Sequence, residues 1–231
     1  MACLASFGGT QTSGADEVAV VGAAAESLDV SHFTFFAGWP NDPYVLDRVE
    51  RFAPGGKRFQ CSTEALERYR GSLRYVAHVH RAFVPRLQRF EALLSDLATQ
   101  TYGRPPRRLV HRGAYACRSV RGRSGRISEH AFGNAIDLHS LEFGSLPRDA
   151  ELPAGLGGSL RRPFRISIKE HWIPSRERDG VHAAFLHRLA EELRRRPDIF
   201  RGIVGPPRPR HRDHLHLDAS PWRYAMFGYD R

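Results

Sequence analysis

The sequence predicts an α+β protein in which a small antiparallel sheet carries a metal site, is packed by helices and follows a helical N-terminal portion. A long stretch with apolar residues at steps of three and four, short alternating segments after it and the lack of a βαβ rhythm predict this class. The chain has 231 residues, 41% of them hydrophobic, which is enough for one domain with a core. Residues 1–30 are small and weakly patterned, so we expect a flexible tail or linker there and a single domain over 31–231.

The first part of the expected domain is irregular and then helical. Aromatic residues and turn formers alternate over its first thirty residues, with one short strand expected at 33–36. Beyond them, Ser62 or Thr63 is a suitable N-cap, and apolar residues follow at helical spacing. This pattern predicts one helix over about 62–100, or two helices broken near Pro85.

Shorter elements are expected in the remainder, which would form the core of the metal site over about 107–220. A helix is expected over 180–196, because Asp179 can cap its start and Pro197 follows three arginines at its end. The strands are expected at 109–111, 134–138, 164–168, 203–204 and 214–217.

The chain is strongly basic. Its formal net charge is +10 and its pI is about 10.2, a field that attracts polyanions such as nucleic acid, anionic cell-wall polymers or acidic phospholipid surfaces. Charge alone does not choose among them. No aromatic ladder of the RNA-binding kind interleaves the arginines, which favours a solvated surface for most of them. No apolar run approaches the ~20 residues of a transmembrane helix, so none is expected.

The cysteines and the N-terminal sequence do not decide the cellular compartment of the protein. The three cysteines, Cys3, Cys61 and Cys117, show no CxxC spacing. An oxidising compartment would permit a bridge between Cys61 and Cys117 with Cys3 left over, and two buried thiols are the alternative. The opening MACLASFGG lacks the charged and apolar regions of a signal peptide. Either the protein stays inside the cell, or this chain lacks its true N-terminus.

Two segments carry residues suited to metal chemistry: SEHAFGNAID, which ends at Asp137, and HRDHLHLD, which ends at Asp218. Zinc prefers imidazole nitrogen and carboxylate oxygen, and a catalytic zinc uses three protein ligands with one position open. His130, Asp137 and His216 would supply such a set.

The expected strand at 134–138 supports this choice. Side chains two residues apart on a strand share a face. Because Ile136 and Leu138 would face the core, Asp137 would point to the opposite side. The small Ala135 would leave room there for a metal.

The other two ligands can reach the same side. Gly133 lets the chain turn and brings His130 back over that face. In the second segment the two leucines would point inward, so that His214 and His216 point together toward the site.

These residues resemble a known family. Ser128–Asp137 resembles the SxHxxGxAxD motif of zinc D-Ala-D-Ala peptidases, and the HLH ending at His216 resembles their closing HxH. Together with the YACR that ends at Arg118, the two segments resemble the bacterial extensin-like C-terminal domain family over about 60–220. That family is similar to the D-Ala-D-Ala carboxypeptidase, murein endopeptidase and lysostaphin-type group.

The resemblance implies zinc on the three ligands named above, a substrate-facing arginine at Arg118 and a base beside the last ligand. His214 and Asp213 both qualify as the base. Strand parity points Asp213 away from the metal and favours His214, which His211 could assist if its loop folds back.

Three further residues are expected to support the site. Ser128 is expected to act by hydrogen bonding and not as a nucleophile. Asp218 and His139 share parity with the ligands and are expected to be hydrogen-bonding partners behind them. A solvated strand end is the alternative for Asp218.

The resemblance implies a zinc-dependent peptidase or amidase acting on peptide bonds of bacterial peptidoglycan, of the D-Ala-D-Ala carboxypeptidase or endopeptidase kind. It implies a periplasmic or secreted envelope location, with anionic wall polymers as further partners. The alternative is a non-catalytic zinc-containing wall-binding module, which would follow if His211 or His214 filled the fourth zinc position. A nucleic-acid-binding protein is suggested by the charge alone, and no motif supports it.

Overall fold

The structure is a computed structural model that describes residues 51–53, 60–123 and 125–229. All of them belong to Thr34–Arg231, the second of two compact units into which the chain divides. The tail expected at 1–30 and the strand expected at 33–36 lie outside the described residues.

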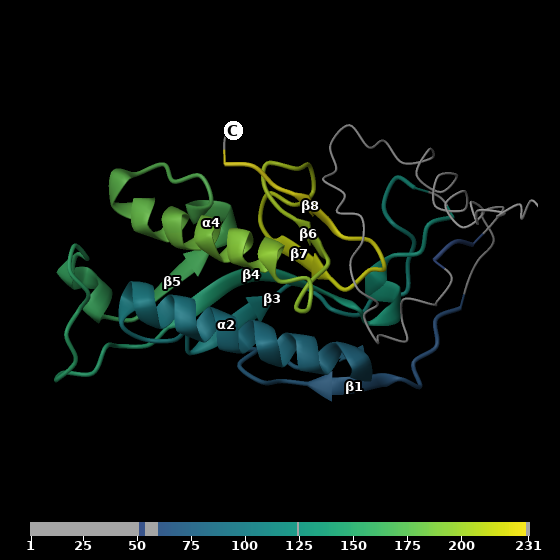
Figure 1. Ribbon diagram of the computed structural model, residues 1–231, viewed down its shortest axis with the longest axis horizontal. Helices are drawn as coiled ribbons and strands as arrows, with labels where there is room; N and C mark the ends of the chain where they lie inside the picture. The colour runs from purple at the N-terminus through teal and green to yellow at the C-terminus, as the bar shows by residue number, and fades with distance from the viewer. Residues whose placement is uncertain (1–50, 54–59, 124, 230–231) are drawn as a thin grey trace, which may run out of the picture. The chain divides into compact units, whose positions relative to one another are not determined.

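The described part is α+β, as the sequence predicts (Figure 1). Six strands form one sheet in the order β3-β4-β7-β6-β8, with β5 also paired to β4, and β1 and β2 form a separate pair. All pairings are antiparallel except that of β6 with β8. The strands are Leu66–Tyr69 (β1), Ala77–His80 (β2), Arg108–His111 (β3), Ala135–Phe143 (β4), Phe164–Ser167 (β5), Gly202–Val204 (β6), Leu215–Asp218 (β7) and Tyr224–Met226 (β8).

Two long helices accompany the sheet and contact each other, α2 (Val84–Tyr102) and α4 (Gly180–Arg195) (Figure 1). The expected helix after Asp179 is therefore confirmed. Within the described residues, no helix combines the length and the apolar character needed to cross a bilayer. The shorter helices are α3 (Ile168–His171) and the 3-10 turns η4 (Arg81–Phe83), η5 (Glu129–Phe132), η6 (Gly158–Arg161) and η7 (Glu177–Asp179).

One face of the sheet is buried by the helices and the other carries polar side chains. Ile136 and Leu138 of β4 are 1% exposed and belong to the same apolar cluster as Phe90 of α2 and Leu189 of α4. Between the two β4 residues, Asp137 is only partly buried. The alternation predicted for this strand is confirmed, and it separates the core from the face that carries the candidate site.

Strand β4 continues past the predicted end and contains a bulge. Its residues before His139 pair with β7 and those after it pair with β5, while His139 pairs with neither. The register to β3 shifts at the same place. An extra residue moves the following side chains to the opposite faces. Leu141 and Phe143 therefore enter the core, in place of the even-numbered positions before the bulge.

The predicted helix over 62–100 is correct only from Val84 onward. Before it, β1 and β2 form an antiparallel pair, so neither Ser62 nor Thr63 caps a helix. Gly71 turns the chain between these strands with a φ of +45°, where an added Cβ would collide with the Glu91 carboxylate. Apolar residues in this segment are spaced three or four positions apart in the sequence, as in an amphipathic helix. Here they belong to two short strands and the turn between them.

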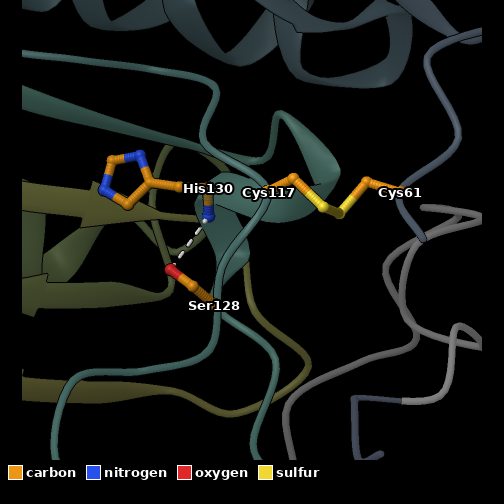
Figure 2. Close-up of a disulfide and its surroundings, with 4 residues drawn as sticks. All are labelled: Cys61, Cys117, Ser128 and His130. Atoms are coloured by element: carbon orange, nitrogen blue, oxygen red, sulfur yellow. Dashed lines mark hydrogen bonds between the residues drawn. A yellow bond between two sulfur atoms is a disulfide. The ribbon is translucent and has the colours of Figure 1, made fainter. Parts of the chain in front are cut away.

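Cys61 and Cys117 are joined in a disulfide, which decides between the two alternatives for these cysteines (Figure 2). The bond links the segment before β1 to the loop before η5, across a sequence separation of 56 residues. A cross-link that closes a loop of this length stabilises a protein chiefly by restricting its unfolded chain.

Replacing both cysteines, in a Cys61→Ser/Cys117→Ser variant, should lower the free energy of unfolding by about 2–4 kcal/mol, because the unfolded chain regains its freedom. Urea denaturation of the variant and the wild type, at one fixed zinc concentration, measures this change. Added reductant should destabilise the wild type and leave the variant unchanged. Equal denaturation midpoints for the two proteins would contradict the prediction.

Candidate metal centre

Two of the expected ligands lie opposite each other on neighbouring strands of the sheet. β4 and β7 pair with Asp137 directly opposite His216. Opposed side chains of an antiparallel pair leave the same face with their Cβ atoms about 4.5–5.5 Å apart. As a result, His216 Nδ1 lies 3.0 Å from Asp137 Oδ1.

The third expected ligand, His130, comes from the 3-10 turn η5 that precedes β4. Ser128 caps this turn, and its Oγ accepts the His130 N–H at 3.4 Å (Figure 2). Gly133 ends the turn with a φ of +65°, and an added Cβ would lie 2.7 Å from the backbone nitrogen of His80. The expected role of Gly133 is therefore confirmed, since only glycine fits both this conformation and this close approach.

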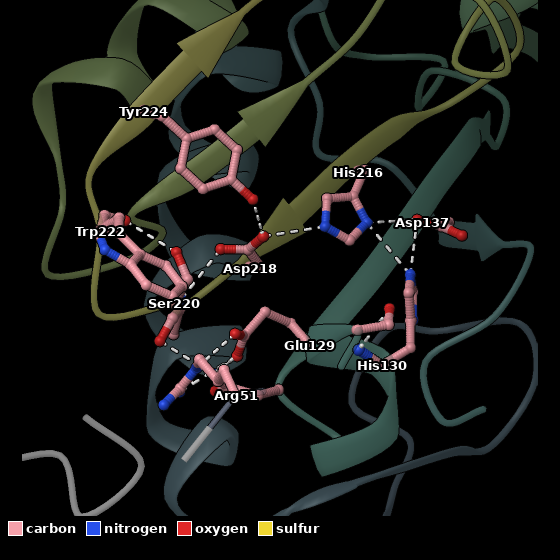
Figure 3. Close-up of polar contacts among 12 residues, drawn as sticks. Arg51, Glu129, His130, Asp137, His216, Asp218, Ser220, Trp222 and Tyr224 are labelled. Carbon is pink, nitrogen blue, oxygen red and sulfur yellow. Dashed lines mark hydrogen bonds and ion pairs between the residues drawn. The ribbon is translucent and has the colours of Figure 1, made fainter. Parts of the chain in front are cut away.

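The three side chains converge on one point (Figure 3). His130 Nε2 lies 3.2 Å from Asp137 Oδ1 and 3.1 Å from His216 Nδ1. Together with the 3.0 Å contact between Asp137 and His216, these distances define a nearly equilateral triangle of one oxygen and two nitrogens.

The outer nitrogen of each imidazole is held by an acceptor. His130 Nδ1–H donates to the Ala114 carbonyl at 2.8 Å, and His216 Nε2–H donates to Asp218 Oδ2 at 2.9 Å. In a neutral imidazole, a proton on the outer nitrogen leaves the inner nitrogen as a lone pair. Three acceptor atoms therefore point at each other, an arrangement that a shared cation stabilises.

The electrostatics also favour positive charge at this point. Burial alone would lower the pKa of His216, but its hydrogen bonds with Asp137 and Asp218 outweigh burial and raise this pKa to about 10. Without a metal, a proton on His216 Nδ1 therefore lies between this nitrogen and Asp137 Oδ1, and a bound cation would replace that proton. Burial would raise the pKa of Asp137, but its contacts with His130 and His216 hold it far below the usual range. A carboxylate that stays ionised beside two imidazoles is a suitable ligand set for a divalent metal.

The dimensions suit zinc. Two ligand atoms about 2.0–2.1 Å from a tetrahedral zinc ion lie about 3.3–3.4 Å from each other. The separations of 3.0, 3.1 and 3.2 Å are slightly shorter, so a small outward movement of the side chains would accommodate the ion.

Asp218 lies behind His216 and is fully buried, so the solvated strand end considered for it is wrong. Its carboxylate also accepts the Tyr224 hydroxyl and, at 3.0 Å, the Ser220 N–H. Small residues on both neighbouring strands make room for it. Ala135 and Gly202 are its cross-strand partners, and a Cβ at Gly202 would collide with the carboxylate.

The two residues expected to compete as base form a pair. His214 Nδ1–H donates to Asp213 Oδ1 at 2.7 Å, and Arg112 forms an ion pair with the same carboxylate. The other nitrogen of His214, Nε2, lies 3.7 Å from Asp137 Oδ1. Burial lowers the pKa of His214, which favours the neutral imidazole. His214 is thus placed toward the ligands and Asp213 behind it.

The remaining expected residues lie around this group without bonding to the ligands among the described contacts. Arg118 donates from Nη1 to the Ser119 carbonyl at 3.4 Å. Burial and Arg121 lower its pKa, while the Asp137 carboxylate raises it, so Arg118 lies within the electrostatic range of the ligands. His139 contacts Ser140 Oγ at 3.2 Å from its place in the bulge.

The His211 ring lies beside those of His214 and His216. Its ring centroid lies 5.1 Å from that of His214 and 6.0 Å from that of His216. Burial lowers the pKa of His211 to about 4, so that it stays neutral near these ligands.

Sequence reasoning missed the support on the other side of His130. The buried carboxylate of Glu129 accepts Arg51 Nε at 2.5 Å and Asn134 Nδ2 at 2.8 Å (Figure 3). Asn134 also donates to the Ala219 carbonyl at 2.9 Å, which ties η5 to the end of β7. The sequence did contain a signal for this support, because the polar residues Glu129 and Asn134 lie in the same short motif as His130. Tyr224 gave none, because it lies in a strand that was not expected.

Replacing His216 with alanine should remove about one zinc ion per chain relative to the wild type, because one side of the ligand triangle is lost. Asp218→Asn should retain the ligands and weaken zinc binding by about 10–100-fold, because the orienting acceptor is altered. Competition with a chromophoric chelator measures both effects. His78→Ala, at an exposed histidine of β2, is the control and should bind zinc as the wild type does. Undiminished zinc binding by His216→Ala would rule out this centre.

Comparison with known proteins identifies one similarity. The family model described as the C-terminus of extensin-like protein matches residues 57–147. The match covers less than half of the chain; it contains His130 and Asp137 and ends before His216. No curated protein and no solved structure shows significant similarity to the chain. Over 57–147, the chain is therefore similar to the extensin-like C-terminal family.

Proposed function

We propose that this protein is a zinc-dependent peptidase or amidase that cleaves peptide bonds of bacterial peptidoglycan, of the D-Ala-D-Ala carboxypeptidase or endopeptidase kind. The observation that carries the proposal is the triangle of His130, Asp137 and His216, whose donor atoms lie 3.0–3.2 Å apart. The resemblance of the two motifs to zinc peptidases supplies the substrate class.

The ligand triangle would hold zinc, which acts as a Lewis acid toward a peptide carbonyl and lowers the pKa of water. His214 Nε2, on the same side as the ligands, would accept the proton of the attacking water. Asp213 accepts the opposite N–H of this imidazole, so it would orient His214 and stabilise the imidazolium that forms. Arg112 holds Asp213 in turn. The proton then passes from His214 Nε2 to the leaving amine.

Arg118 and its neighbours support an anionic substrate. Arg118 is one of seven arginines in the loops 113–128 and 205–212, neither of which contains an acidic residue. The loops meet where Arg210 donates to the Arg121 carbonyl at 3.2 Å. A guanidinium matches a carboxylate in a planar, two-pronged contact. We propose that Arg118 binds a carboxylate of the stem peptide and that anionic wall polymers bind the exposed arginines.

We also propose a periplasmic or secreted location. The disulfide between Cys61 and Cys117 supports it, because such bonds persist in oxidising compartments and are rare in the cytosol.

The test of this function is hydrolysis of purified peptidoglycan. The zinc-loaded protein should release new amino and carboxyl termini, and a chelator should abolish the release, which added zinc restores. Analysis of the products by mass spectrometry identifies the bond that is cut. If intact, zinc-loaded protein releases no product from peptidoglycan or from its isolated stem peptides, the proposal is wrong.

Variants at the base separate its two members. His214→Ala should lower kcat by about 10²–10⁴-fold, because the proton acceptor is lost, while zinc stays bound. Asp213→Asn should lower it less, by about 10–100-fold, because the base remains but is no longer oriented. Turnover measured together with zinc content checks both. His78→Ala should match the wild type, and a larger loss in Asp213→Asn than in His214→Ala would make Asp213 the base.

A non-catalytic zinc module that binds the cell wall is the second candidate, because His214 Nε2 lies only 3.7 Å from Asp137 Oδ1. A small shift would make this nitrogen a fourth ligand and close the site. In that case the protein would have no turnover, and His214→Ala would weaken zinc binding because a ligand is lost. The zinc content of this variant therefore distinguishes the module from the enzyme.

A further inference from the structure

A second group of metal-binding side chains lies at the junction of α3 and α4. His171 ends α3, Asp179 precedes α4, and His182 lies in the first turn of α4. One nitrogen of each imidazole and one Asp179 oxygen all lie within 4.8 Å of one another. None of these residues belongs to the centre on β4 and β7.

From this arrangement we propose a second, structural zinc site formed by His171, Asp179 and His182. Two imidazoles and a carboxylate suit zinc and similar divalent transition metals better than calcium or magnesium, which prefer oxygen ligands. The group combines ligands from both sides of the loop over 172–178.

The imidazole of His182 is oriented for this role. Its Nδ1 lies 3.0 Å from the Tyr102 hydroxyl, which in turn donates to the Val181 carbonyl at 3.5 Å. When the tyrosine hydrogen is committed to that carbonyl, its oxygen accepts the Nδ1–H of His182. A proton on Nδ1 leaves Nε2 of the neutral ring as the lone pair for a metal.

His171 is held through its Nδ1. This nitrogen accepts the Ser167 N–H at 3.0 Å, which places the proton of the neutral ring on Nε2. If that proton moves to Nδ1, the Ser167 carbonyl at 3.2 Å can accept it, and Nε2 is then left for a ligand role. The two imidazoles meet edge to face, with ring centroids 5.0 Å apart. Within the described residues, neither Nε2 atom takes part in a hydrogen bond, and Asp179 forms no ion pair with either imidazole.

A purely packing role accounts for only part of this geometry. The His182 ring stacks on Phe164, with centroids 5.5 Å apart, and is 7% exposed. Stacking explains why a flat ring is buried here. It does not explain why, in the described part of the chain, the Asp179 carboxylate approaches both imidazoles without forming an ion pair with them. A metal would bind all three side chains at one point.

The consequence of zinc at this place is local. Its ligands flank the 172–178 loop, one at the end before it and two at the end after it, so binding would fix this loop to α4. Metal that binds only the folded chain stabilises it by an amount that grows with the logarithm of the metal concentration divided by its dissociation constant. The site would thus stabilise the α3–α4 region without taking part in the reaction at the first centre.

Metal content tests the two sites separately. After equilibration with zinc and removal of the excess, the wild type should contain about two zinc ions per chain by elemental analysis. Asp179→Asn, His182→Gln and His216→Ala should each contain about one fewer, and the double variant Asp179→Asn/His216→Ala should contain none. His78→Ala is the matched control and should contain as much as the wild type. About one zinc in the wild type, with no loss in Asp179→Asn, would overturn the second site.

Thermal unfolding gives an independent measure that does not require activity. In the His216→Ala background, added zinc should raise Tm through the second site alone, and Asp179→Asn should abolish this rise. Asp179 is partly exposed, so this nearly isosteric change preserves the fold even if the buried His182 does not tolerate substitution. An equal rise in Tm with and without Asp179 would contradict the proposal. Failure of peptidoglycan hydrolysis would leave these results unaffected.

Discussion

Asp137 and His216 lie opposite one another in the antiparallel pairing of β4 and β7, and every other part of the candidate centre is placed relative to this pair. The pairing fixes the distance between the two side chains, and burial of the opposite face beneath α2 and α4 fixes the direction in which they point. A shift of register by one residue would expose Ile136 and bury the carboxylate. The stability of the core and the geometry of the site thus depend on the same hydrogen-bond ladder.

Around this pair, the protein fixes which nitrogen of each imidazole faces inward. A backbone carbonyl does this for His130, and the buried carboxylate of Asp218 does it for His216. Asp218 is costly to bury as a charge, and it is compensated by a hydroxyl, a backbone N–H and an imidazole N–H. So many bonds around one buried carboxylate are understandable if the group serves a centre that attracts positive charge.

Much of the site could be predicted from the sequence, because a strand of period two shows which residues share a face, and the ligands lie in two short motifs. The pairing partner of Glu129 and the contribution of Tyr224 could not, because both depend on segments distant in the sequence. The helix predicted over 62–83 was wrong for a different reason. Apolar residues of two short strands and a glycine turn happened to follow helical spacing, and only the turn at Gly71 separates the two possibilities.

The unpaired residue in β4 has a mechanical consequence. Before His139, the strand pairs with β7 and contributes to the candidate centre. After His139, it pairs with β5 and contributes Leu141 and Phe143 to the core. Deleting this one residue would remove the bulge and restore a regular alternation, in which Leu141 and Phe143 still face the core and Asp137 keeps its place. The bulge therefore makes β4 tolerant of the loss of one residue at this point, because the shortened strand can still pair with β3 while both of its apolar segments stay in the core.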